Sequence, residues 1–582
     1  MISKKALLAL FLPLSFTTAF AANTVIPQVV EDIKLMTRNE SRFVLKDAKG
    51  NFLEKTLLAV TPENWFNLSP ADGIEGVRSE ETYARFGMPY SEDIIVAVVD
   101  SGVDVNHEDL QGKIWINDDE IANNGLDDDK NGYVDDVFGW NFIGGADGMA
   151  SMVKDSTLGN GIRLVKGKPE AQIAADTLEL TRELLRMKKL KVKVEELGEE
   201  LTPAQATYLE TLKTVLEESI AATKKNQETF GTHLENYKKA ESVLKAAGLT
   251  TITIESVRAL TSTDEVVLAS REVMLKMLSS NQGEARLNRV LKSLNDQLMY
   301  HYNENFNPRS IIGDNYTDNT ETVYGNNDVI GPDSSHGTHV SGSIAAVRDN
   351  LIGMKGVATN VKIMAVRVVP NGDERDKDVA NGIRYAVDNG AKIINMSFGK
   401  AFSPTKKIVD EAVRYAESKG VLLVHAAGND SKDNDLIPSY PSRTDKKDGR
   451  DFGNWLEIGA SSYLKGETLP AAFTNYGKKT VDLFAPGVDI YSTTPDNAYG
   501  VKSGTSMAAP SVAGVAALTL SYDPSMDATA LKALLIDTSR RYPKLKVNLP
   551  GLGLKVLFSS LSTHGSIVDA FEAAQVSTTV VK

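Results

Sequence analysis

The segment IIVAVVDSGVD, residues 94–104, gives the clearest indication of the fold. It begins with a short apolar run rich in Ile and Val, which predicts a strand buried on both faces of a parallel sheet. The run ends at Asp100, and Gly102 follows in a predicted turn. Functional side chains of open parallel sheets lie at the carboxyl ends of the strands. Asp100 is therefore a candidate site residue, although an Asp at a strand end is more often a turn former or a helix cap.

Similar apolar runs recur along the chain, at residues 361–369, 392–396 and 421–427, and helix-like segments such as 378–387 and 408–418 lie between them. Repetition of strand and helix predicts a parallel sheet covered on both faces. We therefore expect an α/β fold, a doubly wound and mostly parallel sheet with helices on both faces. This predicted domain comprises residues 63–142 and 307–582.

Residues 143–306 are predicted to form a mainly α-helical insertion. From about residue 165 onward this segment is rich in Lys, Glu, Leu and Ala and poor in Gly. Residues 202–205 form a capping box with Pro at the first helical position, and leucines between 287 and 298 recur at helical spacing. We expect about four amphipathic helices. They could bind a partner or shape a cleft, but apolar stripes on helices usually indicate a core.

The first residues have the features of a targeting segment. Residues 1–21 contain two early lysines, a short apolar run and the sequence Ala-Phe-Ala at 19–21, as in a secretory signal peptide. The apolar run is shorter than the ~20 residues of a membrane span. We therefore expect a secreted protein, periplasmic or extracellular, without a membrane span. Residues 22–62 are interpreted as a lead-in or short pro-segment, with a small hairpin near residues 42–53.

The composition excludes several classes of function. The 582 residues include 64 Lys and Arg and 77 Asp and Glu, which gives a formal net charge of −13. An acidic chain without a basic tract is a poor nucleic-acid binder. The absence of cysteine excludes disulfides, thiol catalysis and cysteine-based metal sites. An exported protein of this kind depends for its stability on a large core or on bound metal.

Two further segments contain residue types that are used in catalysis. SHGTHVSG, residues 335–342, surrounds His336 with small residues, and SGTSMAAP, residues 503–510, places Ser506 at the start of a predicted helix. Each has an ordinary structural interpretation when taken alone, as a satisfied histidine or an N-cap serine. His336 and His339 also suggest zinc, but no acidic third ligand lies near them in the sequence.

Together, the three segments resemble the subtilisin-like (subtilase, S8) family of serine proteases. The Asp-Ser-Gly, His-Gly-Thr-His and Gly-Thr-Ser-Met-Ala-Ala-Pro motifs occur in the family's order, and the resemblance covers roughly residues 63–142 and 320–574. It implies a subtilisin-like fold and a catalytic triad of Asp100, His336 and Ser506. Ser506 would attack the peptide carbonyl, His336 would accept and return a proton, and Asp100 would hold the imidazole.

The resemblance also implies an oxyanion donor and a substrate-binding edge. The segment HAAGND, residues 425–430, resembles the family's oxyanion-hole segment, with Asn429 as a side-chain donor. The segment NMSFG, residues 395–399, resembles its substrate segment, along which an extended peptide would add as a strand. Phe398 is bulky for this position, so the sequence does not determine which substrate residue is preferred before the scissile bond. The expected substrate-binding residues are Ser397, Phe398, Gly399 and Gly428.

A calcium site is expected in the loop NGLDDDKNGYVDD, residues 124–136, which is dense in oxygen ligands. The loop resembles the first half of an EF-hand loop, but Phe138 occupies the place of the usual glutamate. Bound Ca²⁺ would stabilise the fold, and the alternative is a solvated acidic loop. The candidate ligands are Asp127, Asp129, Asn131, Tyr133, Asp135 and Asp136.

The sequence departs from the family in the segment between Asp100 and His336, which is much longer than the usual few tens of residues. The helical insertion accounts for the excess, and a role as a cleft lid or selectivity element is a hypothesis. We expect a secreted serine endopeptidase that acts on proteins or peptides, in an undetermined oligomeric state. The alternative is a catalytically silent protein-binding scaffold that uses the insertion. The joint presence of the triad and Asn429 argues against it.

Overall fold

The computed structural model describes most of the chain beyond the lead-in. The predicted signal peptide, residues 1–21, lies outside the described residues. In the lead-in, the strands β1 (Leu45–Lys46) and β2 (Phe52–Leu53) pair antiparallel, which confirms the expected small hairpin. The described residues are 45–46, 52–53, 63–89, 93–156, 161–169 and 172–580.

The chain divides into two compact units. The smaller unit contains residues 175–307, and the larger unit contains the described residues before 175 and after 307. None of the described helices has a stretch long and apolar enough to cross a membrane.

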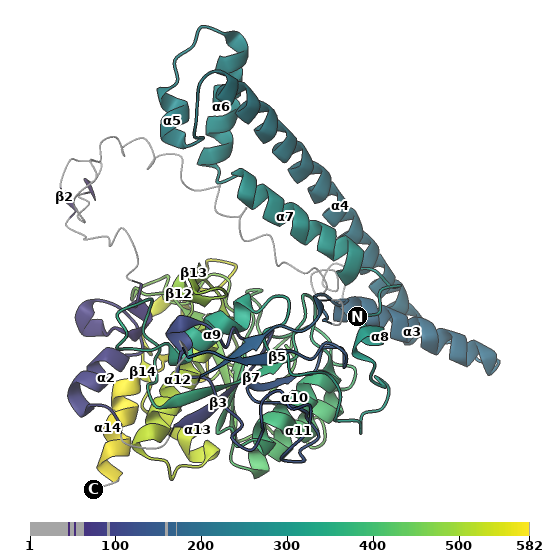
Figure 1. Cartoon of the computed structure of the whole chain (residues 1–582), viewed down its shortest axis with the longest axis vertical. Coiled ribbons are helices and arrows are strands. Elements are labelled where there is room, and N and C mark those ends of the chain that lie inside the picture. Colours follow the sequence, from purple (N-terminus) through teal and green to yellow (C-terminus); the bar gives the residue numbers. More distant parts are fainter. Residues whose placement is uncertain are drawn as a thin grey trace. The chain divides into compact units, whose positions relative to one another are not determined.

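A nine-stranded sheet forms the centre of the larger unit (Figure 1). All neighbouring strands are parallel except the edge pair β14–β17. The strand order reverses at β3, because the chain adds β4 and β7 on one side and β8 to β11 on the other. The predicted doubly wound α/β fold is confirmed. In sheet order the strands are β14 (Arg540–Arg541), β17 (Ser566–Ile567), β11 (Leu483–Pro486), β10 (Trp455–Ser461), β9 (Leu422–Ala426), β8 (Ile393–Met396), β3 (Ile94–Asp100), β7 (Val361–Arg367) and β4 (Gly139–Asn141).

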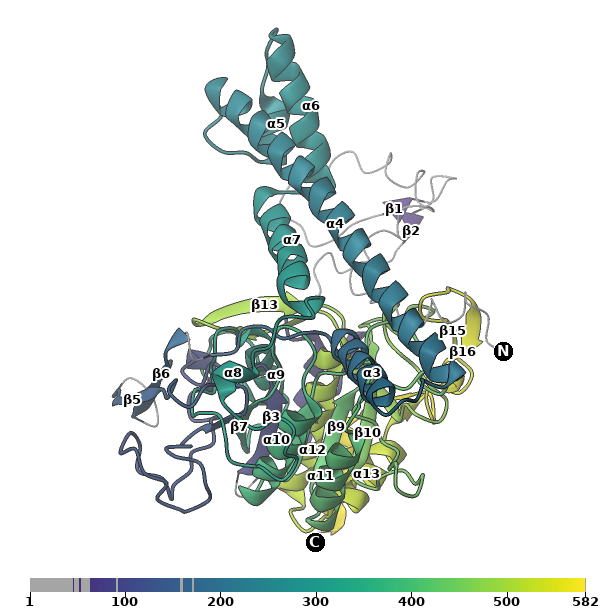
Figure 2. The same ribbon diagram turned by 90° about the vertical axis from the view of Figure 1, so that its right-hand side faces the viewer.

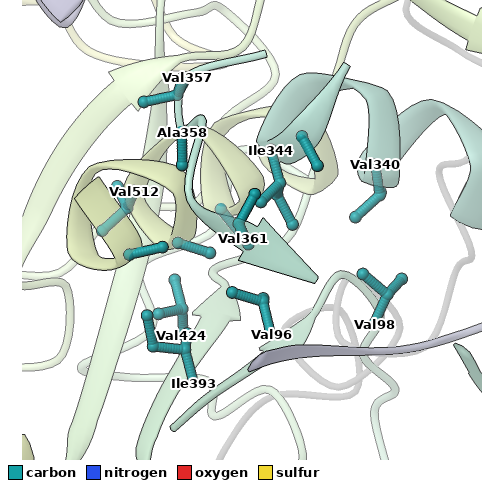
Figure 3. Close-up of a cluster of buried hydrophobic side chains, with 14 of the residues drawn as sticks. Val96, Val98, Val340, Ile344, Val357, Ala358, Val361, Ile393, Val424 and Val512 are labelled. Atoms are coloured by element: carbon teal, nitrogen blue, oxygen red, sulfur yellow. The ribbon is translucent and has the colours of Figure 1, made fainter. Parts of the chain in front are cut away.

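The two faces of the sheet bury alternate residues of each strand, as strand geometry requires. Val96 and Val98 of β3 pack with Val340 of α9 (Ser335–Ala345) and Val512 of α12 (Thr505–Tyr522) (Figure 3). Helices α13 (Ala528–Asp537) and α14 (Ala570–Val580) complete this core. The neighbouring strand residues, such as Val99, face α10 (Asp376–Asp388) and α11 (Lys406–Ser418) instead. The apolar runs predicted as strands and the two predicted helices therefore lie where the sequence placed them, with ends that differ by at most two residues.

Helices, short 3₁₀ turns and hairpins surround the sheet. The helices are α2 (Ser79–Phe86), α8 (Arg309–Ile312), α9 (Ser335–Ala345), α10 (Asp376–Asp388), α11 (Lys406–Ser418), α12 (Thr505–Tyr522), α13 (Ala528–Asp537) and α14 (Ala570–Val580), with short 3₁₀ turns at Trp65–Asn67, Pro70–Asp72, Glu108–Leu110 and Phe558–Ser560. The hairpins pair β5 (Ser151–Lys154) with β6 (Ile162–Val165), β12 (Ile490–Thr494) with β13 (Ala498–Lys502), and β15 (Lys546–Asn548) with β16 (Lys555–Leu557).

The smaller unit is helical (Figure 2). The predicted capping box is present at Thr202, whose hydroxyl accepts the N–H of Gln205 at 3.3 Å. The described part of this unit has five α-helices where about four were expected, and α4 alone runs for 44 residues. Tyr237, Leu244 and Leu287 belong to its own buried core. The elements are α3 (Glu179–Glu196), α4 (Pro203–Ala246), α5 (Ile254–Ala259), α6 (Glu265–Ser279), α7 (Glu284–Asp296) and the π-helix η7 (Gln297–His301).

The segment 143–174, which the sequence analysis placed in the insertion, clusters with the larger unit. The β5–β6 hairpin contributes Met152 and Leu164 to the main core. The backbone of Leu164 also exchanges two hydrogen bonds with the side chain of Asn106, at 2.9 and 3.0 Å. Burial of these apolar side chains against the sheet explains why the helical unit begins only at Ala175.

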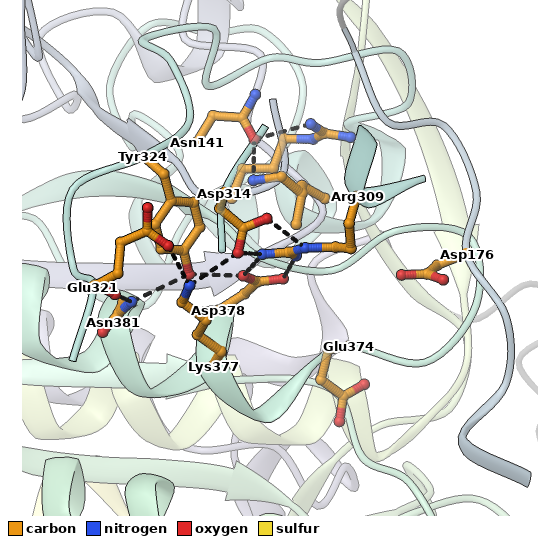
Figure 4. Close-up of polar contacts among 12 residues, drawn as sticks. Asn141, Asp176, Arg309, Asp314, Glu321, Tyr324, Glu374, Lys377, Asp378 and Asn381 are labelled. Carbon is orange, nitrogen blue, oxygen red and sulfur yellow. Dashed lines mark hydrogen bonds and ion pairs between the residues drawn. The ribbon is translucent and has the colours of Figure 1, made fainter. Parts of the chain in front are cut away.

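A buried ion cluster fixes the chain where it returns to the sheet after residue 307. The guanidinium of Arg309 lies between two carboxylates, 2.8 Å from Asp314 and 2.7 Å from Asp378 of α10 (Figure 4). Lys377 reaches Asp314 at 2.9 Å and Glu321 at 2.7 Å. The side chains of Arg309, Asp314, Lys377 and Asp378 are all at most 5% exposed. Charges removed from water to this degree are stable only as a complete set.

Replacing Arg309 with Met should lower the free energy of unfolding of the larger unit by about 3–5 kcal/mol, because two buried carboxylates would lose their shared partner. All four tryptophans of the chain lie in this unit. Denaturant unfolding followed by tryptophan fluorescence measures the change. The matched control is Lys407→Met, since Lys407 is 80% exposed and lies 3.8 Å from Glu411; its effect should stay below about 1 kcal/mol. Equal losses in the two variants would contradict the prediction.

Candidate active site

Asp100 and His336 form a hydrogen-bonded pair at the carboxyl end of β3. Asp100 is the last residue of the strand, and His336 is the second residue of α9. His336 Nδ1 lies 2.8 and 3.0 Å from the two carboxylate oxygens of Asp100. The Asp100 side chain is 2% exposed and that of His336 is 36% exposed. Because Nδ1 is engaged by Asp100, Nε2 is the nitrogen that is available for proton transfer.

Ser506 reaches the same edge of the sheet from the start of α12. Met396 of β8 pairs with Val99 of β3, so Ser397 follows at the strand end beside Asp100. The Ser506 hydroxyl donates to the carbonyl oxygen of Ser397 at 3.1 Å, rather than to His336. The Ser397 hydroxyl donates in turn to the carbonyl oxygen of Ser506, at 3.0 Å. The Ser506 hydroxyl therefore lies at the end of β8, the strand that pairs with β3 and its terminal Asp100.

Two hydrogen-bond donors converge next to Ser506. Asn429 follows β9, and its Oδ1 accepts the backbone N–H of Thr505 at 2.8 Å and the Thr505 hydroxyl at 3.0 Å. A backbone N–H donates only to the oxygen of an amide, so this contact leaves Nδ2 of Asn429 free to donate. Ser506 is the second residue of α12, and its N–H has no acceptor within the helix. Both nitrogens lie within 3.7 Å of the point where a Cβ on Gly504 would stand.

Thr505 and Asn475 organise this region, and sequence reasoning identified neither. The Thr505 hydroxyl also accepts the N–H of Gly428, at 3.1 Å. Oδ1 of Asn475 accepts the N–H groups of Asp430 and Lys432, each at 2.9 Å, and Nδ2 of Asn475 donates to the carbonyl oxygen of Ala427. Thr505 could have been found from its place in the Gly-Thr-Ser motif. No local sequence pattern points to Asn475, because its side chain binds a loop more than forty residues earlier in the chain.

The expected substrate edge lies open beside Ser506. Gly399 is exposed and Phe398 is half-buried. A Cβ on Gly399 would stand 2.9 Å from Ser439 Oγ and 3.9 Å from the ring of His425. Gly428 has a φ of +108°, and a Cβ there would collide with Asn475 at 2.4 Å. Glycine is therefore required at position 428 by backbone conformation and by packing.

The model of the subtilase family matches residues 91–554 of this sequence. The chain belongs to the subtilase family of serine endopeptidases. It is 37% identical over 235 residues to thermitase of Thermoactinomyces vulgaris, an alignment that covers 39% of this chain and 77% of thermitase. It is 42% identical over 189 residues to a thermophilic serine proteinase of Bacillus sp. (strain AK1), covering 32% of this chain and 43% of that protein.

Among solved structures, one of proteases from Pseudoalteromonas arctica PAMC 21717 aligns with 44% of this subtilase, at 31% identity and a TM-score of 0.34, and 74% of that chain is covered. The subtilase fold is established here by its own sheet and by the family match. Because the chain spans less than half the length of the Bacillus proteinase, its activity and substrates are inferred from the site.

His339 has a structural environment in this subtilase, and the zinc alternative finds no support in the described residues. His339 is fully buried in α9, and its Nε2 donates to the carbonyl oxygens of Ile490 at 3.0 Å and Gly500 at 3.2 Å. Burial lowers the pKa of His339 to about 3, so the ring is neutral at pH 7. His336 Nδ1 is held by Asp100. Neither histidine belongs to the cluster of possible metal ligands in the described part of the chain.

The acidic loop places only part of the predicted ligand set together. Carboxylate oxygens of Asp127 and Asp129 lie within 4.8 Å of each other and of Glu120. Glu120 lies upstream of the Asp-rich segment, and sequence reasoning missed it because the EF-hand comparison did not extend there. All three carboxylates also accept backbone N–H groups of the loop, Asp127 from Gly132 at 2.9 Å, Asp129 from Asn131 at 3.0 Å and Glu120 from Asp128 at 2.7 Å.

The other predicted ligands hold the loop in shape. Asp135 accepts the N–H groups of residues 124 and 125. Asp136 is buried, accepts the hydroxyl of Tyr385 at 2.6 Å, and has a pKa that burial raises to about 6. Asn131 donates to Asp129 and Asp136. The hydroxyl of Tyr133 donates to the carbonyl oxygen of residue 322. Asp135 and Asp136 lie outside the cluster of carboxylates formed by Glu120, Asp127 and Asp129, whereas Asn131 contacts that cluster through Asp129.

Replacing His339 with Gln should reduce the loss of unfolding free energy that occurs when the pH falls below 7. The folded pKa of His339 is about 3, whereas an unfolded chain has about 6.5. The unfolded state therefore binds more protons between these values, and stability present above pH 6.5 is lost as the pH falls toward 3. From pH 7 to pH 5 the wild type should lose about 2 kcal/mol through this residue.

The Gln variant keeps an N–H donor and does not titrate. Its free energy of unfolding should therefore fall by about 2 kcal/mol less than that of the wild type between pH 7 and pH 5. Urea unfolding at pH 7 and pH 5, followed by tryptophan fluorescence, tests this, with His233→Gln in the other unit as the control. Identical losses in the wild type and His339→Gln would show that His339 does not carry the effect.

Proposed function

We propose that this subtilase is a secreted serine endopeptidase that hydrolyses peptide bonds of proteins or peptides through an acyl-enzyme on Ser506. The observation that carries the proposal is the contact of 2.8 Å between His336 Nδ1 and the Asp100 carboxylate, beside the helix start that bears Ser506. Secretion is supported by the features of residues 1–21. The triad roles are supported by this geometry together with the three motifs.

The first half of the reaction forms the acyl-enzyme. The Ser506 hydroxyl would leave its bond to Ser397, pass its proton to His336 Nε2 and attack the substrate carbonyl carbon. Asp100 would stabilise the imidazolium that forms. As the tetrahedral intermediate collapses, the bond between carbon and nitrogen breaks, and His336 returns the proton to the leaving amine. Ser506 then carries the acyl group as an ester.

The second half of the reaction releases the acyl group. Water would give a proton to His336 and attack the ester, and the proton would return to Ser506 as the carboxylic acid leaves. Negative charge on the substrate oxygen develops in both halves. Asn429 Nδ2 and the Ser506 N–H would stabilise it, and Thr505 would hold the Asn429 amide in the required orientation. In subtilisin, a relative of this protein, loss of such an asparagine lowers kcat by about 10²–10³.

The substrate would bind as an extended strand along Ser397, Phe398 and Gly399. The exposed edge at Gly399 leaves backbone groups free to pair with it. Gly428 would form the opposite wall for the residue before the scissile bond. Ser439 and His425 lie beneath Gly399, so the floor of this position is polar.

Ser506→Ala should lower the rate of casein hydrolysis by roughly 10⁴-fold or more, because no other group replaces the nucleophile. Ser418→Ala, at the end of α11, is the control and should retain full activity. A fluorophosphonate should label the wild type and the control but not Ser506→Ala, and a brief exposure to a chelator should not change the labelling. Equal casein hydrolysis by the wild type and Ser506→Ala would reject the proposed mechanism and favour the scaffold alternative.

We further propose that Glu120, Asp127 and Asp129 hold a structural Ca²⁺ ion. Their donor set fits this ion, because hard cations prefer carboxylate oxygens, and the three carboxylates lie close enough to share one ion. Bound Ca²⁺ would neutralise their mutual repulsion and stabilise the loop. The role assigned to the ion is structural, and no step of hydrolysis involves it.

Added Ca²⁺ should raise the thermal midpoint of unfolding in the inactive Ser506→Ala background, where self-cleavage cannot interfere. The expected stabilisation is about 2.7 kcal/mol when free Ca²⁺ exceeds the Kd about a hundredfold. Asp127→Asn should abolish most of this shift, whereas Asp118→Asn, an exposed neighbour outside the cluster, should keep it. An equal shift in Asp127→Asn and the background protein would place the calcium effect elsewhere.

A further inference from the structure

Lys502 brings a positive charge next to the Asp100–His336 pair. It is the last residue of β13 and lies four positions before Ser506. Its Nζ donates to the hydroxyl of Ser335 at 2.8 Å, and Ser335 directly precedes His336 at the start of α9. Burial lowers the pKa of Lys502, while Asp333 and Asp100 act in the opposite direction. The ammonium is therefore partly dehydrated and lies within electrostatic reach of the triad.

This charge has no committed partner among the described carboxylates. Asp100 is occupied by His336 and by the N–H of Ser101, at 2.7 Å. Asp333 is exposed, and its carboxylate accepts the N–H of Ser335 at 3.0 Å. Lys502 forms an ion pair with neither of them. An ammonium has three donors, and the one hydrogen bond to Ser335 leaves it able to bind a further acceptor.

The position of Lys502 indicates which part of a substrate it would meet. The acyl side of the substrate is expected along Ser397 to Gly399, the edge to which the Ser506 hydroxyl now bonds. His336 must deliver its proton to the leaving nitrogen, so it borders the other side. Lys502 contacts the residue before His336 and approaches from a different element, the β12–β13 hairpin. It therefore lies on the leaving-group side of the scissile bond.

We propose that Lys502 is a specificity-determining residue that favours substrates with a carboxylate side chain in the first or second position after the scissile bond. The proposal rests on the proposed endopeptidase function. A partly desolvated ammonium gains more from a carboxylate than one in bulk water does. A purely structural role, in which Lys502 only ties β13 to α9, would give no such selectivity.

The test uses quenched fluorescent peptides that differ at one position, Glu in one and Gln in the other. One pair carries the change at the first position after the scissile bond, a second pair at the second position, and a third pair two positions before it. Mass spectrometry fixes the cleaved bond. The ratio of kcat/KM for Glu over Gln is measured for the wild type, Lys502→Met, Lys502→Arg and Lys502→Glu, each checked for folding by its thermal midpoint.

In the wild type, kcat/KM for the Glu peptide should exceed that for the Gln peptide about three- to tenfold when the change lies after the scissile bond. This ratio should decrease at high salt. Lys502→Met should bring it to one or below, Lys502→Arg should preserve it, and Lys502→Glu should invert it. Equal ratios in the wild type and Lys502→Met, or a Glu preference confined to the pair that differs two positions before the bond, would overturn this role while the protease assignment stands. If the wild type cleaves neither peptides nor casein, the proposed function fails, and the role of Lys502 falls with it.

Discussion

The close approach of α9 to the end of β3 is the constraint on which the site depends. A Cβ on Gly337 would stand 2.1 Å from the carbonyl oxygen of Gly102, so the two backbones can meet only because residue 337 is glycine. This contact brings the imidazole of His336 into hydrogen-bond distance of Asp100. The Asp100 side chain is almost completely buried, and such a carboxylate is tolerated only with hydrogen-bond partners. The approach of the helix supplies one of them.

The geometry of the parallel sheet brings the other residues of the proposed site together. Parallel strands present their carboxyl ends at one edge, and the reversal of strand order at β3 separates the connections there. Asp100, Ser397 and Asn429 follow three different strands and meet at this edge. The loops between them are held by side chains such as Thr505 and Asn475, whose hydrogen bonds fix the backbone near Asn429. These hydrogen bonds hold the proposed oxyanion donors in place, and Gly399 is exposed at the edge proposed to bind a peptide.

A chain without cysteine must stabilise this arrangement by other means. The two apolar faces of the sheet contribute most of the burial, and Val96 and Val99 illustrate the division between them. Where the chain returns to the sheet after the helical unit, polar contacts stabilise it instead. The ion pair between Arg309 and Asp378 anchors this segment to α10. Such buried ion sets specify one arrangement, because a shifted chain would leave a charge unpaired in the interior.

Local sequence patterns were enough to predict the strands, the larger helices, the helical insertion and the motif residues. The apolar run at residues 94–99 and the capping box at Thr202 need no knowledge of distant residues. Which side chains contact one another across elements depends instead on the folded structure. The start of the helical unit at Ala175, the grouping of Glu120 with Asp127, and the contact of Lys502 with Ser335 all depend on packing between distant residues. Side chains that meet across elements leave no periodic signal in the chain, so their contacts exist only once the sheet and its helices are assembled.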